Sequence, residues 1–261
     1  MLSKPRSLCV VALALVLGLL GASCKAGGHE TAIKHRHRAA PTTTTAAPVQ
    51  AAAVLPAGVP APTKIALLAT AKNATIALHP APGSTAVVKT LANPTLEGMP
   101  LAMLAVDQAA DWFEVRIPER PNGTTAWVRA ADVDTTPVTN RIVISTSQRS
   151  LKVLDAAQQT IYETNVAVGK PSTPTPLGRF YVDIWLPNPG RPYGSFMLSI
   201  AGFSDVLKSF GGGRGQIAMH GWADPSVMGK NASNGCVRMR NGDISHLSEL
   251  APLGTPVEII A

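Results

Sequence analysis

Cysteine is scarce in this sequence: among 261 residues there are three, Cys9, Cys24 and Cys236. Three cysteines do not make the disulfide framework of a small secreted protein, so each needs its own explanation. The chain also has no internal repeat and no glycine pattern of a dinucleotide-binding or P-loop protein, so neither a repeat architecture nor those nucleotide folds are indicated. Hydrophobic residues make up 46% of the chain, which excludes wholesale disorder.

Most of the chain carries little excess charge, although the formal net charge is +7. Residues 1–63 hold six basic side chains against one acidic side chain, and residues 64–261 hold 17 against 15. A nucleic-acid-binding protein is expected to gather its basic residues on a folded face. The excess lies in the N-terminal segment instead, so no nucleic-acid partner is predicted.

The N-terminus has the order of an export signal. Lys4 and Arg6 precede an apolar run over residues 8–20, and small residues follow directly before Cys24. This order is typical of a secretory signal, and its end resembles a bacterial lipobox, in which the cysteine is acylated. We expect a signal peptide over residues 1–23 and lipidation of Cys24, which holds the protein to the outer face of the cytoplasmic membrane. An uncleaved anchor and simple secretion are the alternatives, because the uncharged run is near the shortest length of a spanning helix.

The segment 24–63 is rich in Ala, Pro and Thr. Such a composition buries little apolar surface, so we expect a linker between the membrane and the folded part. His29, His35 and His37 are interpreted as members of a solvated basic tail, because no rigid scaffold there would fix metal-ligand geometry. No metal and no other cofactor is predicted.

Short apolar runs broken by turn residues fill the next segment, without a helical period. This pattern predicts a small β-barrel. Its end, from Trp112 to Val133, resembles the closing hairpin of bacterial SH3-like domains, and an SH3-like domain is assigned to residues 64–136. Trp112 and Trp127 are either core residues or ligand platforms. The expected strands cover residues 65–68, 75–78, 86–88, 100–106, 112–117 and 126–128.

A second β-rich domain is predicted for residues 138–261, with the length of a catalytic domain. A sandwich is expected, with one helix over residues 243–250, Asn241 or Asp243 at its N-cap, and Gly254 after its end. The long segment 184–215 is either a lid over the site or an exposed hairpin. The expected strands cover residues 142–144, 151–154, 160–162, 166–168, 180–185, 196–200, 216–219 and 256–260.

The chemistry is predicted at Cys236 and His220. A single cysteine in the exported part suggests use as a nucleophile, because a free thiol outside the cytosol is exposed to oxidation. A base must come from elsewhere in the fold. His246 lies inside the expected helix, whereas His220 ends a strand and is followed by Gly221, at the type of junction where catalytic side chains are common.

The residues around Cys236 fit acyl transfer. Gly235 lets the backbone approach a substrate closely, so the amides at 235 and 236 are expected to form an oxyanion hole. If the chain is extended from Cys236, then Arg238 lies on the same face, and Val237 and Met239 lie on the other. A guanidinium there favours the thiolate and can bind a carboxylate. The alternative is a small buried cysteine beside a surface arginine.

The order of these residues resembles the signature of the L,D-transpeptidases of the YkuD family. His220-Gly221 is followed 16 residues later by Cys236, within the sequence Ser-Asn-Gly-Cys-Val-Arg-Met. Further matches follow the family's order and extend the resemblance over about 140–261: Val168-Gly169, Pro174 to Phe180, and Tyr193-Gly194. The resemblance implies a YkuD-type β-sandwich with one or two short helices that cross-links peptidoglycan, and a cysteine that carbapenems acylate.

The resemblance also assigns roles to residues. It implies that Cys236 is the nucleophile and His220 the general base, with the Gly221 carbonyl orienting the imidazole. The amides near Gly235 and Cys236 would form the oxyanion hole. Substrate contacts would come from the following residues: Ser233, Asn234, Arg238 and Tyr193.

The implied reaction is a 3→3 cross-link in which a stem tetrapeptide loses D-Ala and its acyl group passes to the side-chain amine of a neighbouring stem. A carboxypeptidase with the same acyl-enzyme and a wall-binding lipoprotein with an inactive site are the alternatives. Sortases separate His and Cys more widely, and NlpC-type hydrolases have the opposite order. One departure is Asn234, where the family often has His; because Asn can donate a hydrogen bond, we expect an active site with His220 as its base.

Overall fold

The computed structural model describes residues 65–261, which belong to one compact unit. The signal peptide, the lipidation of Cys24 and most of the linker fall on residues 1–64 and lie outside the described residues. Within the described part, no helix has both the length and the apolar character needed to cross a membrane. The structure is mainly β, and its single α-helix in this range is α1, Asn241–Leu250.

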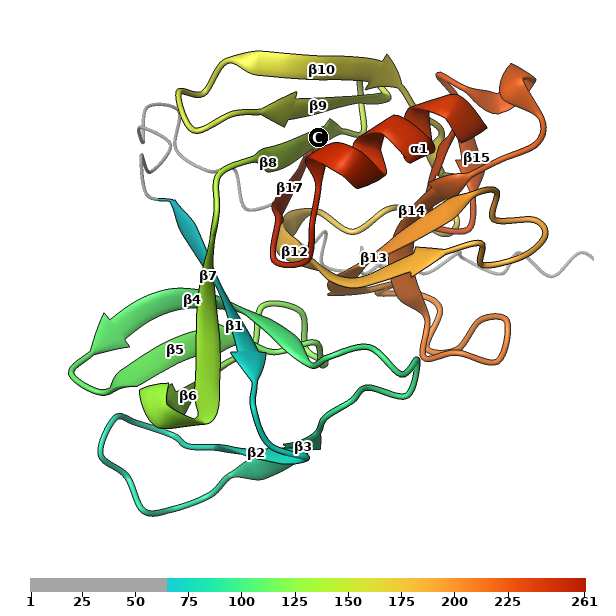
Figure 1. The fold of residues 1–261 in the computed structure, drawn as a ribbon. Coiled ribbons are helices and arrows are strands. Elements are labelled where there is room, and N and C mark those ends of the chain that lie inside the picture. The colour runs from blue at the N-terminus through green and yellow to red at the C-terminus, as the bar shows by residue number, and fades with distance from the viewer. Residues whose placement is uncertain (1–64) are drawn as a thin grey trace, which may run out of the picture. The chain divides into compact units, whose positions relative to one another are not determined.

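The N-terminal β unit, residues 65–138, is a five-stranded antiparallel sheet of order β6-β5-β4-β1-β7 with a separate hairpin β2-β3 (Figure 1). Its own hydrophobic core gathers inward-facing residues of both sheets, among them Ile76, Leu78, Met103, Val115 and Val128. Its elements are β1 Ala66–Ala71, β2 Thr75–Leu78, β3 Lys89–Ala92, β4 Ala102–Ala109, β5 Trp112–Arg116, β6 Thr125–Arg129, the 3-10 turn η1 Ala130–Asp132 and β7 Val133–Val138.

Two details of this unit differ from the sequence prediction. The strand expected at 86–88 is wrong: Val87 and Val88 are exposed and the strand follows at Lys89–Ala92. The edge strand β7 was not predicted, because its central residues are polar or exposed and it contains Pro137. Proline is tolerated on an edge strand, and pairing with β1 forms the strand. β7 therefore runs through Val138, past the expected domain limit at 136.

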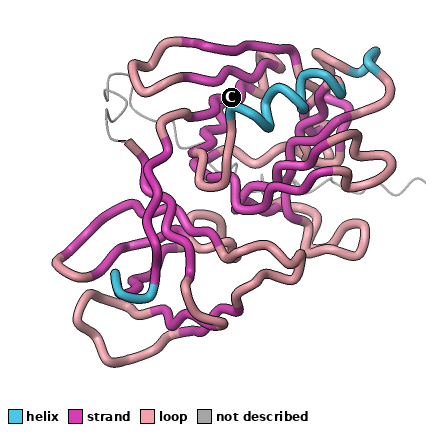
Figure 2. Tube along the Cα trace, in the orientation of Figure 1, coloured by secondary structure: helices cyan, strands magenta, loops and turns pink. Residues whose placement is uncertain are grey.

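The C-terminal β unit, residues 139–261, is built on an eight-stranded sheet of order β10-β9-β8-β17-β12-β13-β14-β16. Strands from both halves of this sheet contribute to one hydrophobic core, which fits the predicted sandwich. The course of these strands can be followed in Figures 1 and 2. Its elements are β8 Arg141–Ser145, β9 Ser150–Leu154, β10 Thr160–Asn165, β11 Val168–Gly169, β12 Gly178–Pro187, β13 Phe196–Phe203, β14 Gln216–Gly221, η2 Pro225–Val227, β15 Asn231–Ser233, β16 Val237–Met239, α1 Asn241–Leu250 and β17 Pro256–Ile260.

The helix α1 confirms the expected helix but begins two residues earlier, at Asn241. Arg240 holds the N-cap position and makes no side-chain cap hydrogen bond, so the expected Asn or Asp cap is wrong. Ile244 and Leu247 bury the apolar side of the helix in the core of the C-terminal unit. The Asn241 side chain instead lies against the backbones of Gly194 and Gly221.

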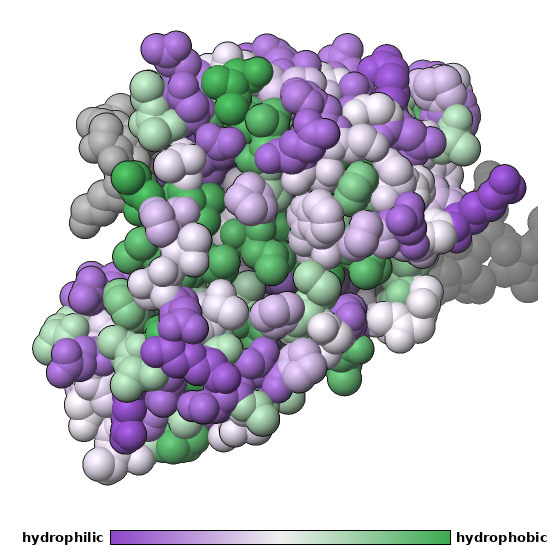
Figure 3. Space-filling view, in the orientation of Figure 1, coloured by the Kyte–Doolittle hydropathy of each residue, from purple (hydrophilic) through white to green (hydrophobic). Residues whose placement is uncertain are grey.

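The two units are joined by direct packing. Tyr181 on β12 is fully buried, and its hydroxyl lies 3.1 Å from the carbonyl oxygens of both Ala102 and Arg116. Leu104 of β4 packs in the same small cluster as Tyr181 and Ala201. Hydrophobic residues are visible in Figure 3 where the units meet. The N-terminal unit therefore packs on the C-terminal sheet through β12, which β13 separates from β14.

Candidate active site

The strands β14 and β16 bring the predicted residues together. They pair in parallel, with His220 opposite Arg238 and Met219 opposite Val237. Val237 and Met239 are fully buried in the core, and successive residues of a strand point to opposite faces. His220 and Arg238 therefore lie on the other face, and Cys236, one residue before β16, continues their row, as the sequence predicted.

His220 is buried, with 3% of its surface exposed. Its Nδ1 lies 2.8 Å from the Gly221 carbonyl oxygen. A carbonyl only accepts, so Nδ1 carries the proton and Nε2 is left as an acceptor. Burial lowers the pKa of His220 to about 4, against an opposing effect of the Gly221 hydrogen bond and with a smaller lowering by Arg238. The imidazole is thus neutral near pH 7 and ready to accept a proton.

The Cys236 residue is partly accessible and unpaired. Burial raises the pKa of its thiol, and the backbone of Ala218 and the charge of Arg238 oppose this only in part. Arg238 therefore favours the thiolate, as expected, but burial outweighs it. At rest the pair is a neutral thiol with a neutral imidazole, so the thiol must lose its proton during attack rather than before it.

The Cys236 turn, residues 231–236, is fixed by buried hydroxyl groups. Ser233 is 1% exposed; its Oγ accepts from the Gly235 amide at 3.0 Å and donates to the Cys236 carbonyl. Thr175 Oγ1 donates to the Gly235 carbonyl at 2.8 Å and accepts from the Gly169 amide at 2.9 Å. Gly235 has φ +119°, and a Cβ there would lie 3.0 Å from Ile217 Cδ1, so the turn requires glycine.

The structure of this turn differs from two sequence predictions. The Gly235 amide already donates to Ser233, so it does not point freely at a substrate oxygen. Ser233, expected at the substrate, is instead buried and holds the turn. Thr175 was missed as a supporting residue; its signal was its place in the Pro174 to Phe180 motif.

Arg238 is held by a tryptophan that the sequence reasoning also missed. Its guanidinium carbon lies 3.6 Å from the ring centroid of Trp222, the distance of a cation–π contact. Its Nη1 donates to the Ala232 carbonyl at 3.1 Å, while its Nε is buried without a hydrogen-bond partner in the described part of the chain. The stacked cation can hold an anionic group on the face that carries His220 and Cys236.

Tyr193 completes the group on this face. Its ring stands edge-on to the His220 ring, with centroids 5.0 Å apart and an interplanar angle of 86°. The following residue, Gly194, has φ +74°, and a Cβ there would lie 2.7 Å from the Gly221 Cα. This close backbone contact brings Tyr193 to His220. Asn234 is partly exposed, and no side-chain hydrogen bond of it is found among residues 65–261.

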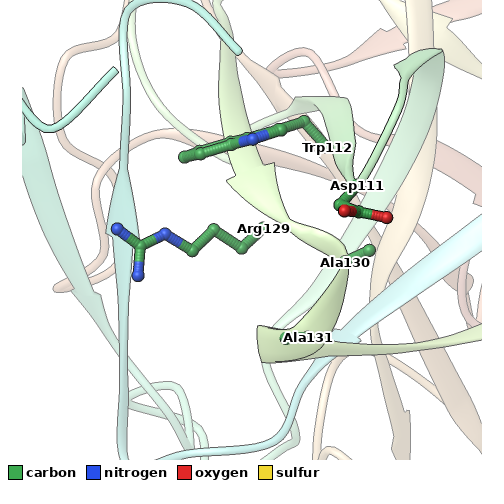
Figure 4. A pocket seen from close by; sticks show the side chains of 5 residues that line it. All are labelled: Asp111, Trp112, Arg129, Ala130 and Ala131. Carbon is green, nitrogen blue, oxygen red and sulfur yellow. The ribbon is translucent and has the colours of Figure 1, made fainter. Parts of the chain in front are cut away.

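Two open cavities lie away from the thiol face. One, of about 330 Å³, lies on the N-terminal unit (Figure 4), where Arg129 and Trp112 project side by side with a guanidinium-to-ring distance of 5.6 Å. Trp112 and Trp127 are both half-buried, so neither is a fully enclosed core residue. The other, also about 330 Å³, is lined by residues that include Gly169, Pro174, Thr175 and Asn231. Among the described residues, no group of three or more His, Cys, Asp or Glu side chains is placed to hold a metal ion.

A mainly β fold with an oriented imidazole at the end of β14 and a free cysteine directly before its parallel neighbour β16 defines a class of cysteine-containing β-sandwich domains. Residues 139–259 match the family model of the L,D-transpeptidase catalytic domain, YkuD. A Bacillus licheniformis protein named L,D-transpeptidase YkuD is 35% identical over 126 residues, which cover 48% of this chain and 67% of that protein. The chain therefore belongs to the YkuD family of L,D-transpeptidase catalytic domains.

Other relatives and solved structures are similar over about a third to a half of this chain. The L,D-transpeptidase YkuD of Bacillus subtilis is 37% identical over 94 residues, 36% of this chain and 50% of that protein. The catalytic domain of an E. faecium L,D-transpeptidase is 21% identical, over 46% of this chain and 96% of that chain, with a TM-score of 0.37. A structure from Bdellovibrio bacteriovorus is 28% identical, over 47% of each chain, with a TM-score of 0.38. The chain thus spans about half to two thirds of the curated relatives it matches.

Proposed function

We propose that this protein is a peptidoglycan L,D-transpeptidase that forms 3→3 cross-links by acyl transfer through Cys236. The observation that carries the proposal is the parallel register of β14 and β16, which aligns His220 with Arg238 and sets Cys236 on the same face. Family membership supports the reaction class. The proposal adds to this reaction class the 3→3 product and the roles of the individual residues.

The first step forms a thioester. Cys236 Sγ attacks the carbonyl carbon between the third residue and the terminal D-Ala of a stem tetrapeptide, and Nε2 of His220 takes the thiol proton. The tetrahedral intermediate collapses as His220 returns that proton to the departing amine, and D-Ala leaves. The neutral His220 that burial maintains suits this exchange, because a protonated imidazole could not accept the proton.

The second step transfers the acyl group. The side-chain amine of a neighbouring stem attacks the thioester carbonyl, its proton passes to His220, and Cys236 leaves as a thiolate that regains the proton. Water in place of the amine would give the carboxypeptidase product from the same thioester. The oxyanion is assigned to the Cys236 amide and to the Asn234 side chain, because the Gly235 amide donates to Ser233.

Arg238 is assigned to a substrate carboxylate. Its guanidinium is stacked on Trp222, and Nη1 donates to the Ala232 carbonyl. No hydrogen bond of Nη2 is found within the described residues, and unlike Nε it is not a buried atom, so Nη2 remains available to a ligand. A carboxylate is the usual partner of such a fork. Tyr193, edge-on to His220, is assigned to the wall of the donor site.

The N-terminal unit and the leader are proposed as placement devices. The five-stranded antiparallel sheet with its own core supports an SH3-like module over 64–136 beside a catalytic domain over 138–261. The Cys24 lipobox supports a lipid anchor in the cell envelope. If Cys24 is acylated, the mature protein partitions into detergent, and Cys24→Ala releases it or leaves the precursor. A wild-type protein of precursor length without lipid would show an uncleaved anchor instead.

Mass spectrometry of the products from a disaccharide-tetrapeptide tests the function. We expect a cross-linked dimer with loss of D-Ala; a tripeptide alone would identify a carboxypeptidase. Cys236→Ala is expected to abolish acylation and turnover together, and Cys236→Ser is expected to be nearly as inactive, because one imidazole hardly ionises a hydroxyl. Transpeptidation that persists in the alanine variant would refute the nucleophile assignment.

A further inference from the structure

The loop between β13 and β14, residues 204–215, is held by the other unit of the molecule. Arg120, in the β5–β6 loop of the N-terminal unit, directs its guanidinium at three carbonyl oxygens of this loop. Nη1 donates to Ser204 at 2.7 Å, and Nη2 donates to Leu207 at 3.2 Å and to Arg214 at 3.0 Å. Hydrogen bonds from a charged donor are stronger than those between neutral groups, so Arg120 ties together both ends of the loop.

Neighbouring contacts complete this attachment. Asn122 binds the backbone of Phe203 twice, since its Nδ2 donates to the carbonyl and its Oδ1 accepts from the amide, both at 2.8 Å. Arg120 also lies over the Phe203 ring, 4.9 Å from its centroid. At Gly215, which has φ +69°, a Cβ would lie 2.0 Å from the Leu207 carbonyl oxygen. The chain therefore crosses itself at the point that Arg120 covers.

The far end of the loop reaches the predicted site. A Cβ on Gly211, at the loop tip, would lie 3.9 Å from the Tyr193 hydroxyl, and the Tyr193 ring stands edge-on to His220. The loop that Arg120 holds therefore has its tip close to the Tyr193 hydroxyl, and the Tyr193 ring in turn lies against the imidazole. Among the described residues, the tip, with Gly211, Gly212 and Gly213 exposed, has no comparable attachment of its own beyond a backbone bridge between Phe210 and Gly213.

We propose that Arg120 is a positioning residue of the reaction: the N-terminal unit holds the 204–215 loop with its tip at the Tyr193 hydroxyl, at the edge of the donor site, and thereby limits the movement of Tyr193 against His220. This inference rests on the proposed function for its kinetic readout, but its structural part does not depend on it. Loss of Arg120 frees the loop without touching the thiol or the imidazole. Coupling between sites commonly changes a binding affinity by 5- to 150-fold, and we expect weaker binding of the tetrapeptide donor, seen as a fall of about tenfold in kcat/KM.

The test compares Arg120→Ala, Arg120→Lys and Arg129→Ala in the full chain. Arg129 lies on the same unit, exposed and away from the loop contacts, and serves as the matched control. Trypsin cleavage after the exposed Lys208 reports loop opening, and peptide mass spectrometry after iodoacetamide reports access to Cys236. Arg120→Ala is expected to speed both, to lower kcat/KM, and to keep the thermal midpoint close to that of Arg129→Ala. Arg120→Lys, with a single donor group, is expected to restore part of each effect.

Two results would overturn the proposal. One is that Arg120→Ala has the same rate of trypsin cleavage at Lys208 and the same kcat/KM as Arg129→Ala. The other is a lowered thermal midpoint with cleavage spread over the whole chain, which would make Arg120 a stability contact only. If the wild-type protein does not turn over the tetrapeptide, the proposed function fails, and cleavage at Lys208 and alkylation of Cys236 still decide whether Arg120 holds the loop.

Discussion

The Cys236 turn and the 204–215 loop border the same site, yet they are held in different ways. The turn is fastened from within the C-terminal unit by the buried hydroxyls of Ser233 and Thr175. The loop is fastened by Arg120 of the N-terminal unit, and its tip is exposed. The proposed reacting groups are thus held within the C-terminal unit, whereas the loop is held by the N-terminal unit. Substitutions that loosen the turn should slow the acylation step, whereas substitutions that free the loop should change access to the site.

After loss of the thiol itself, the largest expected effect is at the base. His220→Ala removes the group that accepts the thiol proton, so acylation should slow on the order of 10²–10⁴-fold, the usual range for a general base. The rate of thioester formation, followed by mass spectrometry, measures this. Unchanged acylation in His220→Ala would mean that another group takes the proton. Effects of turn and loop substitutions on the rate could then no longer be referred to His220 as the base.

A stability measurement tests the sheet beside the loop. Asp183 on β12 is buried; its Oδ2 accepts from Gln216 at the start of β14, and its Oδ1 has no partner within the described residues. Burial raises the pKa of Asp183 to about 7 from its ordinary 3.8, with Glu97 raising it further and Gln216 and Arg214 opposing. The folded state therefore holds the proton more tightly, and stability present below about pH 4 is lost as pH rises to about 7.

Asp183→Asn removes this titration. Between pH 4 and pH 8 the wild type should lose about 2–4 kcal/mol more unfolding free energy than the variant, since each pKa unit corresponds to about 1.4 kcal/mol. Urea unfolding of both proteins at the two pH values gives this difference between two pH-dependent changes. The cost of the unpaired amide in the variant is the same at both pH values and therefore cancels. Equal pH dependence of the two proteins would contradict a protonated Asp183 in the folded state.

Loss of a buried hydroxyl should disturb the turn. Thr175→Val keeps the shape of the side chain but removes the bonds to Gly169 and Gly235, at a cost of about 1–3 kcal/mol. We expect acylation to slow about 10- to 100-fold, with no increase in trypsin cleavage at Lys208. Thr125→Val, at an exposed position of β6, is the matched control. Faster cleavage at Lys208 in Thr175→Val would show that turn and loop are not independent.

The pH profile of acylation should reflect the low pKa of His220. Because burial lowers this pKa to about 4, the rate should be level from pH 7 to about 5 and fall about tenfold by pH 3. Folded protein binds this proton less readily than unfolded protein, so stability present above pH 6.5 also declines as pH falls toward 4. Circular dichroism at each pH separates the two losses. An inflection near pH 6.5 would show an exposed, ordinary imidazole.

The smallest effect is expected at Asn234. Its partly exposed side chain is assigned a single hydrogen bond to the oxyanion, so Asn234→Ala should lower acylation less than tenfold, in line with about 1 kcal/mol for one such bond. Asn234→His should stay active. If Asn234→Ala is as damaging as His220→Ala, Asn234 is a principal catalytic group and the assigned division of roles is wrong.

Local patterns predicted the parts of the site that lie on regular strands. The alternation around Arg238 gave the correct faces of β16, and the apolar run at 216–219 located β14. Thr175, Trp222 and Arg120 could not be assigned in this way, because each acts on a segment far away in the chain and becomes visible only when loops meet. The strand β7 was not predicted for a related reason: its polar residues form a strand only because they pair with the edge of β1.

The protonated state of the Cys236 thiol at rest also affects how readily this thiol is oxidised. Peroxides attack the thiolate rather than the thiol, and burial keeps the pKa of Cys236 above its ordinary value. Sulfenic acid should therefore form slowly on this residue, even though its surface is partly open. If Cys236 is the proposed nucleophile and loses its proton only when a substrate carbonyl is in place, it is protected against oxidants between turnovers without a second cysteine to reduce it.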